Sequence, residues 1–213
     1  MIHIAKGGLS WIIVSFALFF VVLVLVFFIL SSFLLLLCFF CFLISCLLIV
    51  FFRDPERTIG TGIVAVADGT IREVASLPDP DIGDSIKVST FMNIHNVHVN
   101  RMPFDGTILK ITHHAGGHLP AFTKESDVNE RVVLLIHTSL GLMKVVQIAG
   151  TIARRIVPYV HEGDTVKKGE KLGLIRLGSR VDLFLPATRI KTVAIQVHQK
   201  IKAGEDSVAE PHG

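Results

Sequence analysis

The chain has 213 residues, with 21 Lys and Arg against 18 Asp and Glu, and a formal net charge of +3. Hydrophobic residues other than glycine make up 51% of it. Soluble domains reach only about 45–50% even when glycine is counted. This composition excludes an ordinary soluble globular protein and indicates a membrane segment.

The apolar excess lies near the N-terminus. Residues 7–52 contain no charged side chain, and Ser31-Ser32 divides the run into residues 11–30 and 33–52. Each half has the roughly 20 residues that a helix needs to cross a hydrocarbon core of about 30 Å. We therefore predict that residues 1–52 form a membrane anchor of two transmembrane helices, a helical hairpin. A single long tilted helix with an interfacial segment is the alternative.

Basic residues flank the apolar run on both sides. Lys6 precedes it, and Arg53 and Arg57 follow it. Because positive flanks stay on the cytoplasmic side, we expect a cell (inner) membrane protein whose remaining domain faces the cytoplasm. The cysteines all lie inside the run, where they are expected to act as small hydrophobes without a redox or metal role: Cys38, Cys41 and Cys46.

Residues 53–213 amount to one domain with a mainly β pattern. Gly-Thr-Ile steps followed by alternating apolar residues recur at residues 67–74, 104–111 and 148–157. Period-2 alternation with regularly spaced turn residues predicts short, half-buried strands. The stretch VHEGDTVKKGEKLGLI, residues 160–175, resembles the barrel-sandwich hybrid domains of lipoyl and biotin carriers, so we predict a β domain of that kind.

Three further stretches break or interrupt this strand pattern. Residues 113–131 form a long polar segment with two adjacent glycines, which is typical of a functional loop. Residues 203–213 have the composition of a disordered tail. Within LIRLGSRVDLFLP, residues 174–186, the step Gly178-Ser179 separates two segments that both have strand character. A tight turn is the simplest interpretation of that step.

Several motifs together suggest another interpretation of Gly178-Ser179. They are FFRDPER after the anchor, ADGTI, STFMNIHNVHVNRMPFDGTI, the KESDVNER loop and LGSRVD. With them the chain resembles the phosphatidylserine decarboxylase family in its short, membrane-anchored form. The resemblance implies self-cleavage between Gly178 and Ser179 into chains 1–178 and 179–213, which stay paired without a covalent bond. It also implies that Ser179 becomes a pyruvoyl group, so that no external cofactor and no metal is needed.

The chemistry accounts for these residue types. The Ser179 hydroxyl attacks the Gly178 carbonyl to give an ester, and elimination followed by hydrolysis leaves the pyruvoyl group and ammonia. A serine hydroxyl is a weak nucleophile, so this step needs a neighbouring base and oxyanion stabilisation. The finished carbonyl forms a Schiff base with the serine amine of the lipid and takes up the electrons left by CO2. A positioned acid must then return a proton.

The family pattern points to His98 and Asp68 for these proton transfers. Long-form members carry a second histidine three residues after the position of His98, and this chain has Arg101 there. The identity of the cleavage base therefore stays open between His98 serving both steps and a contribution from Asp68.

Substrate binding is expected at the end of the polar loop, where the family also has the sequence NER. The resemblance brings Asn129 and Arg131 to the site. Arg131 or Arg101 matches a phosphate or carboxylate through its guanidinium, and a plain surface salt bridge is the other interpretation of either arginine.

The sequence leaves some choices open. An archaeal-type ether-lipid serine is an alternative to phosphatidylserine in the membrane as substrate. A non-enzymatic, membrane-anchored adaptor on a lipoyl-like barrel is a rival from another class, and chain integrity separates it from a self-cleaving enzyme. A zinc peptidase is disfavoured because no H-E-x-x-H motif accompanies the ten histidines. We expect no nucleic-acid partner, and a homo-oligomer is left open.

Overall fold

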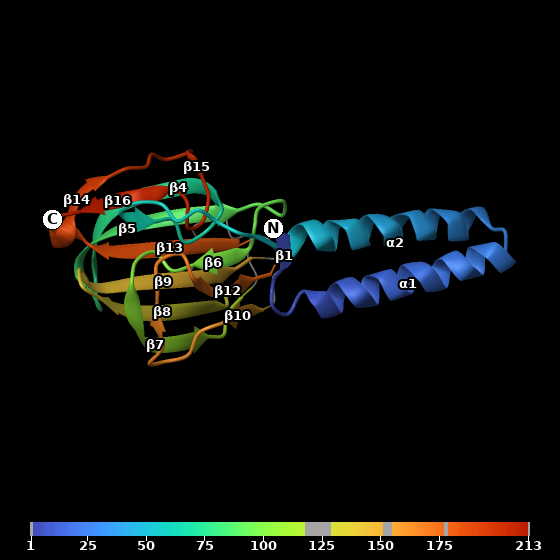
Figure 1. Ribbon diagram of the computed structural model, residues 1–213, viewed down its shortest axis with the longest axis horizontal. Coiled ribbons are helices and arrows are strands. Elements are labelled where there is room, and N and C mark those ends of the chain that lie inside the picture. The colour runs from blue at the N-terminus through green and yellow to red at the C-terminus, as the bar shows by residue number, and fades with distance from the viewer. Residues whose placement is uncertain (1, 118–128, 151–154, 177–178, 213) are drawn as a thin grey trace. The chain divides into compact units, whose positions relative to one another are not determined.

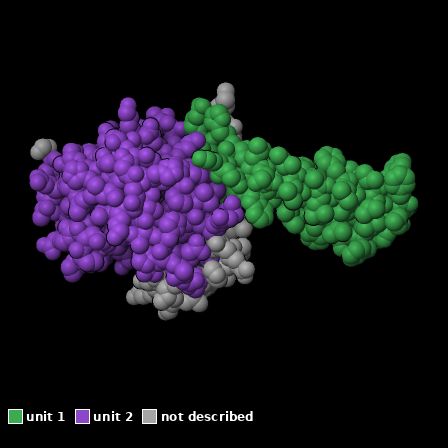
Figure 2. All heavy atoms as spheres, turned by 90° about the horizontal axis from the view of Figure 1, so that it is seen from below, with its two compact units in different colours: residues 1–56 green, residues 57–213 purple. Residues whose placement is uncertain are grey.

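The computed structural model describes residues 2–117, 129–150, 155–176 and 179–212. The chain divides into two compact units, residues 1–56 and residues 57–213 (Figure 2). The fold is mainly β, with two apolar helices near the N-terminus, as the sequence predicts (Figure 1).

Unit 1 holds the helical hairpin. Helices α1 (Leu9–Phe28) and α2 (Ser32–Phe51) lie close to the ranges 11–30 and 33–52 expected from the sequence. Strand β1 (Ile2–Ile4) pairs antiparallel with β2 (Arg53–Pro55), which brings the two ends of the hairpin together. Both helices are long and apolar enough to cross a membrane, by length and composition.

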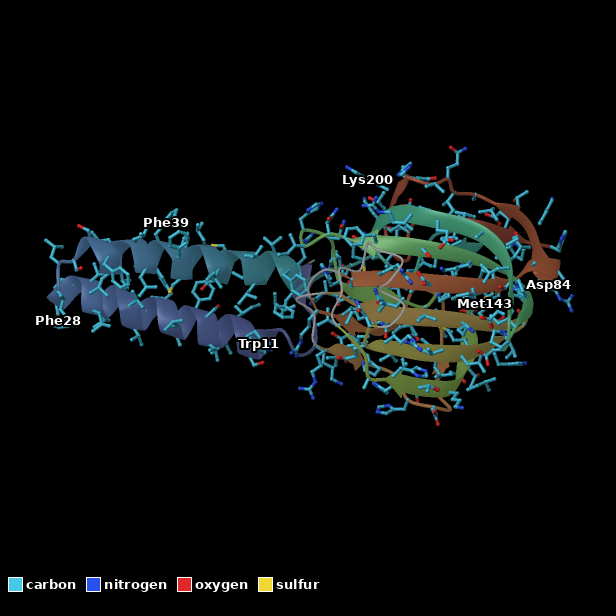
Figure 3. All side chains as sticks on the ribbon, turned by 180° about the vertical axis from the view of Figure 1, so that it is seen from behind. Trp11, Phe28, Phe39, Asp84, Met143 and Lys200 are labelled. Atoms are coloured by element: carbon cyan, nitrogen blue, oxygen red, sulfur yellow. The ribbon has the colours of Figure 1, made fainter. Side chains whose placement is uncertain are left out.

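Few side chains are buried between the two helices of the hairpin. Val22 and Val26 of α1 pack against Cys38 and Cys41 of α2. Other large apolar side chains project outward and are more than half exposed, among them Trp11, Phe28 and Phe39 (Figure 3). Helices that are apolar on every side need an apolar environment, so these outer faces are suited to lipid.

Unit 2 is built around an eight-stranded antiparallel sheet that curls into a half-barrel (Figure 1). The order is β11-β7-β8-β9-β13-β5-β4-β15. Its strands are β4 (Gly69–Asp79), β5 (Gly83–Met92), β7 (Gly106–His114), β8 (Arg131–Thr138), β9 (Gly141–Ala149), β11 (Thr165–Val166), β13 (Ser179–Pro186) and β15 (Lys200–Ile201). Strand β13 is therefore central, between β9 and β5.

Two three-stranded sheets complete the unit. One has the order β10-β12-β6, and the other has the order β14-β16-β3. The core draws side chains from all three sheets and excludes water between them. The remaining elements are β3 (Ile63–Val64), β6 (Val99–Arg101), β10 (Ile156–Pro158), β12 (Lys171–Ile175), the 3-10 helix η2 (Ala187–Arg189), β14 (Ile190–Val193) and β16 (Ser207–Pro211).

The repeated Gly-Thr-Ile step marks strand starts, as predicted. Gly69 begins β4 and Gly106 begins β7. A Cβ at Gly69 would lie 2.2 Å from the carbonyl oxygen of Phe91, and one at Gly106 would lie 2.6 Å from that of His137. Neither position has room for a side chain. The third repeat continues into residues 151–154, outside the described residues.

The C-terminal segment corrects the sequence analysis. We expected residues 203–213 to be disordered, and this prediction was wrong. Ser207–Pro211 forms β16, which pairs with both β3 and β14, and Val208 and Ala209 are buried in the core. These partners are distant in the sequence, so local composition did not reveal them.

Candidate functional site

Ser179 is the first residue of the central strand β13, and its side chain is fully buried. In register it lies opposite Met92 of β5 and Ala149 of β9. The Ser179 hydroxyl donates to the Met92 sulfur at 3.4 Å. The preceding residue of the predicted cleavage site, Gly178, lies outside the described residues. Strand β12 ends at Ile175 and β13 begins at Ser179, so the two predicted strands are present, but Ser179 belongs to the second of them.

Strand alternation gives β13 two different faces. Ser179 and Val181 point to the core face, whereas Arg180 and Asp182 point to the other face. Burial raises the pKa of the Asp182 carboxyl, and the neighbouring charges of Arg180 and Lys87 oppose that rise. The charged groups of β13 are thus kept away from the Ser179 hydroxyl.

His98 lies beside the strand that leads to the cleavage site. It is fully buried, and its backbone oxygen accepts from the backbone nitrogen of Ile175, the last residue of β12. The Nδ1 atom lies 2.9 Å from the carbonyl oxygen of Asn96. Since a carbonyl only accepts, Nδ1 carries the hydrogen of this bond, and in the neutral ring Nε2 is then the basic nitrogen.

Asn100 belongs to the same site, although the sequence analysis did not single it out. Its side chain is fully buried, its Oδ1 accepts from Gln147 Nε2 at 2.7 Å, and its Nδ2 lies 3.8 Å from the Met92 sulfur. Asn100 and Ser179 therefore contact the same sulfur atom. The period-2 spacing of His98 and Asn100 was the available signal, because it predicts one shared face.

Asp68 lies just before β4 in a buried ion pair. Its two oxygens accept from Arg57 Nη2 at 3.0 and 2.8 Å, and Oδ1 also accepts from the backbone nitrogen of Ala203 at 2.7 Å. Arg57 Nη1 in turn donates to Glu205 at 3.1 Å. These donors hold the Asp68 carboxylate in place. The FFRDPER motif thus supplies, through Arg57, a partner that the sequence analysis did not assign to Asp68.

This ion pair predicts a stability effect. Arg57→Leu is expected to lower the free energy of unfolding by about 3–5 kcal/mol, because it leaves the Asp68 carboxylate buried without its guanidinium partner. Urea unfolding followed by circular dichroism in detergent measures the change. Glu73→Gln is the control, since it breaks the half-exposed pair with Lys87 and is expected to change stability by less than about 1 kcal/mol. Equal small losses in both variants would contradict the assignment.

Arg101 is buried on the other face of β6 from Asn100. Its Nη1 donates to the Gly169 carbonyl at 2.9 Å. A Cβ at Gly204 would lie 3.0 Å from Arg101 Cδ, and Gly204 follows the residue whose amide binds Asp68. Arg101 and Asp68 therefore both lie against the segment Ala203-Gly204. An arginine keeps its proton in proteins, so Arg101 is not a base.

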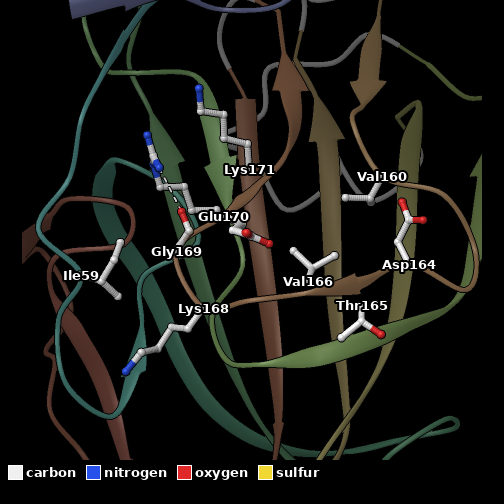
Figure 4. A pocket seen from close by; sticks show the side chains of 10 residues that line it. Ile59, Val160, Asp164, Thr165, Val166, Lys168, Gly169, Glu170 and Lys171 are labelled. Carbon is white, nitrogen blue, oxygen red and sulfur yellow. Dashed lines mark hydrogen bonds between the residues drawn. The ribbon is translucent and has the colours of Figure 1, made fainter. Parts of the chain in front are cut away.

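A pocket of about 630 Å³ opens beside Arg101 (Figure 4). Its charged lining includes Lys168, Lys171, Asp164 and Glu170, so both signs are present. Because Arg101 lines the pocket, it can contact a ligand bound there. The lining carries both positive and negative side chains, so its charge alone does not favour binding of an anion.

The two candidate substrate-binding residues from the polar loop, Asn129 and Arg131, lie on different sides of the large sheet. Asn129 is fully buried, and its Nδ2 donates at 2.8 Å to the carbonyl of Ala149, the register partner of Ser179. Arg131 begins β8 on the face opposite the core, where it lines a second pocket of about 480 Å³. The structure thus brings Asn129 to the strand beside Ser179 and directs Arg131 to the other side of the sheet.

The surroundings of Ser179 accommodate a small carbonyl group. Two side-chain donors, the Ser179 hydroxyl and Asn100 Nδ2, converge on one weak sulfur acceptor. A carbonyl formed at position 179 replaces one of these donors by an acceptor, which suits the remaining donor, Asn100 Nδ2. Among the residues that the structure describes, no group of three His, Cys, Asp or Glu side chains is placed to hold a metal ion.

Comparison with known proteins identifies the family. The profile of the phosphatidylserine decarboxylase family matches residues 45–209. This chain belongs to the phosphatidylserine decarboxylase family. The match includes Ser179, His98 and Asp68, so the resemblance drawn from the sequence motifs is confirmed at the level of the family, and the chain is a decarboxylase.

Bacterial and archaeal relatives both match. A phosphatidylserine decarboxylase proenzyme of Streptomyces coelicolor is 49% identical over 158 residues, which cover 74% of this chain and 70% of the relative. A protein of Methanococcoides burtonii, provisionally named archaetidylserine decarboxylase proenzyme, is 39% identical over 210 residues, covering 97% of this chain and 96% of the relative. Both names include the word proenzyme.

Proposed function

We propose that this chain is a membrane-anchored, pyruvoyl-dependent phosphatidylserine decarboxylase, which converts phosphatidylserine to phosphatidylethanolamine and CO2. The observation that carries the proposal is the buried Ser179 at the start of β13, directly after Gly178, in a chain whose relatives are named proenzymes. The domain 53–213 cleaves itself at that step, and chains 1–178 and 179–213 remain paired through the strands on either side of β13.

Cleavage begins at the Ser179 hydroxyl. Its oxygen attacks the Gly178 carbonyl, and the peptide bond becomes an ester. Elimination then releases the Gly178 carboxylate as the end of chain 1–178 and leaves a dehydroalanine, which hydrolyses to the pyruvoyl group and ammonia. The Ser179 proton must be accepted by a base, and His98 Nε2 is the basic nitrogen of a ring oriented through Nδ1. No external cofactor takes part in the proposed mechanism.

During decarboxylation the pyruvoyl group supplies an electrophilic carbonyl that accepts the electron pair released with CO2. His98 supplies the proton that returns to the substrate carbon. Asn129 holds the Ala149 carbonyl and so fixes β9 beside position 179. Burial of these side chains excludes water, which would otherwise compete for the proton transfer. Arg101, at the edge of its pocket, binds the phosphate or carboxylate of the headgroup. Arg131 lies on the face of β8 opposite the core and is not assigned to the headgroup.

The substrate lipid carries a phosphoserine headgroup. Phosphatidylserine is the substrate in the name of the bacterial relative, whereas the relative that matches 97% of the chain carries the name of an ether-lipid enzyme. Purified protein in mixed micelles should release CO2 from serine-labelled phosphatidylserine, and a parallel assay with the diether analogue ranks the two lipids. A processed chain that releases CO2 from neither lipid would refute the proposal.

The anchor keeps the enzyme at its substrate. Helices α1 and α2 cross the membrane as a hairpin, and the basic residues that flank them keep both ends on the cytoplasmic side of the cell membrane: Lys6, Arg53 and Arg57. The headgroup then enters the site from the leaflet to which the domain is tethered.

Removal of residues 1–52 tests the role of the anchor. We expect the shortened chain to stay in solution without detergent and still to cleave itself, because Ser179, His98 and Asp68 all belong to unit 2. Ultracentrifugation followed by gel electrophoresis measures both properties, and the same truncation carrying Ser179→Ala is the uncleaved control. A truncated domain that folds but stays in one piece would mean that the anchor also takes part in cleavage.

A further inference from the structure

A buried pair of amide side chains lies beside Ser179. Gln147 of β9 donates from Nε2 to Asn100 Oδ1 at 2.7 Å, across from the large sheet to β6. Both side chains are fully buried, as are Met92 and Ser179. Gln147 interrupts the apolar run of β9 on its core face, where a polar side chain lowers stability unless its hydrogen bonds are satisfied. This pair has no role in the function proposed above.

The hydrogen bond from Gln147 fixes the orientation of Asn100. It occupies Oδ1, so the amide nitrogen Nδ2 turns toward the Met92 sulfur at 3.8 Å. Gln147 itself is confined, because a Cβ at Gly173 would lie 3.2 Å from Gln147 Nε2. Gln147 Oε1 is buried and has no hydrogen-bond partner among the described residues. The pair therefore directs the donor Asn100 Nδ2 toward the sulfur that Ser179 also contacts, while the acceptor Gln147 Oε1 stays without a hydrogen bond among the described residues.

The donors and acceptors near Ser179 do not match in the uncleaved chain. The Ser179 hydroxyl and Asn100 Nδ2 both point at a thioether, which is a weak acceptor. Buried donors without a good acceptor lower stability. Processing removes the Ser179 hydroxyl, because its oxygen leaves with Gly178, and hydrolysis puts a carbonyl oxygen on the α carbon of residue 179. One of the two donors is lost and an acceptor is created, so the match improves once the chain has been processed.

We propose that Asn100 donates a hydrogen bond from Nδ2 to the carbonyl oxygen formed at position 179, and that Gln147 is the positioning residue that aims it. The inference rests on the proposed pyruvoyl chemistry and adds to it a donor that polarises this carbonyl. Such a donor acts after cleavage, because its acceptor does not exist before. The pair therefore contributes to Schiff-base formation, in which the substrate amine adds to this carbonyl and its oxygen leaves as water, and not to processing.

Asn100→Leu tests the donor. We expect the variant to cleave completely, to give a chain 179–213 of the same mass as wild type, and to lose roughly 10²- to 10³-fold in kcat with KM nearly unchanged, the usual effect of removing a preorganised donor from a developing charge. A second readout needs no substrate. Phenylhydrazine labels ketone carbonyls, and we expect chain 179–213 to be labelled more slowly in the variant, since its carbonyl is less polarised.

Two further variants make the test specific. Asn100→Asp keeps the acceptor for Gln147 and removes the donor, so it should show the same loss and serves if Asn100→Leu fails to fold. Gln147→Met should give a smaller loss of kcat, because Asn100 stays in place but is no longer oriented. Thr138→Val is the control: it removes a buried hydroxyl that bonds to Gly141 at the far end of β8, and it should leave kcat and labelling unchanged.

Several results would overturn the inference. Wild-type kcat and labelling in both Asn100 variants would exclude the donor, and an uncleaved Asn100 variant would assign the pair to processing instead. An equal loss in Thr138→Val would make the effect a general consequence of a weakened core. Failure of the proposed function is distinguishable, because the wild-type protein itself would then remain uncleaved or resist phenylhydrazine.

Discussion

Ser179→Ala is expected to leave the chain in one piece and without decarboxylase activity. The alanine methyl group cannot attack the Gly178 carbonyl, so neither the ester nor the pyruvoyl group can form. The fold should persist, because within the described part of the chain the Ser179 hydroxyl bonds to the weak sulfur acceptor of Met92. Gel electrophoresis measures cleavage, and CO2 release from phosphatidylserine measures activity.

Ser85→Ala is the matched control for this variant. Ser85 is a buried serine of β5 that lies opposite Pro186, the other end of β13, and its hydroxyl donates to the Leu77 carbonyl at 2.7 Å. Its loss should lower stability by about 1 kcal/mol and leave cleavage intact. A cleaved, active Ser179→Ala protein would refute the assignment of the cleavage site.

His98→Ala is expected to reduce decarboxylation by about 10²- to 10⁴-fold, the contribution of a positioned general acid. The residue is fully buried, and its ring is oriented by the Asn96 carbonyl, so the alanine variant loses both the proton donor and its fixed position. Turnover should be normalised to the fraction of chain that has been processed, which separates the two steps.

The processing rate of His98→Ala decides which group is the cleavage base. Slow cleavage would indicate that His98 serves both steps, whereas normal cleavage would shift the role toward Asp68, and Asp68→Asn should then block processing. Arg101 stands where long-form members have a second histidine, and it cannot take over as a base. Wild-type rates of both steps in His98→Ala would contradict the assignment, and His95 would be the next candidate.

Local patterns were sufficient to predict the strands and helices near the site. The two strand-like apolar runs around Gly178-Ser179 predicted two strands, and β12 and β13 are found there, although β13 already includes Ser179. The Gly-Thr-Ile step predicted strand starts at Gly69 and Gly106, where a neighbouring backbone carbonyl excludes any side chain. Such features depend on adjacent residues and can be recognised without tertiary contacts.

Pairings between distant residues were not predictable in this way. The tail at 203–213 appeared too polar for a strand, yet Ser207–Pro211 pairs with β3 and β14, and pairing of this kind overrides local propensity. Arg57 reaches Asp68, and Gln147 reaches Asn100 from 47 residues away. The position of Arg131 could have been predicted from the sequence. Side chains alternate along a strand, so a strand with Val132 in the core places Arg131 on the opposite face.

The intact mass of the purified wild-type protein tests the central claim most directly. We expect two polypeptides, residues 1–178 and residues 179–213, in equal amounts. The smaller should be lighter by one ammonia than the same peptide with a free N-terminal serine, and it should resist Edman degradation because a pyruvoyl group has no amine. A single intact chain of 213 residues with full decarboxylase activity, or a smaller chain that begins with unmodified Ser179, would contradict the account.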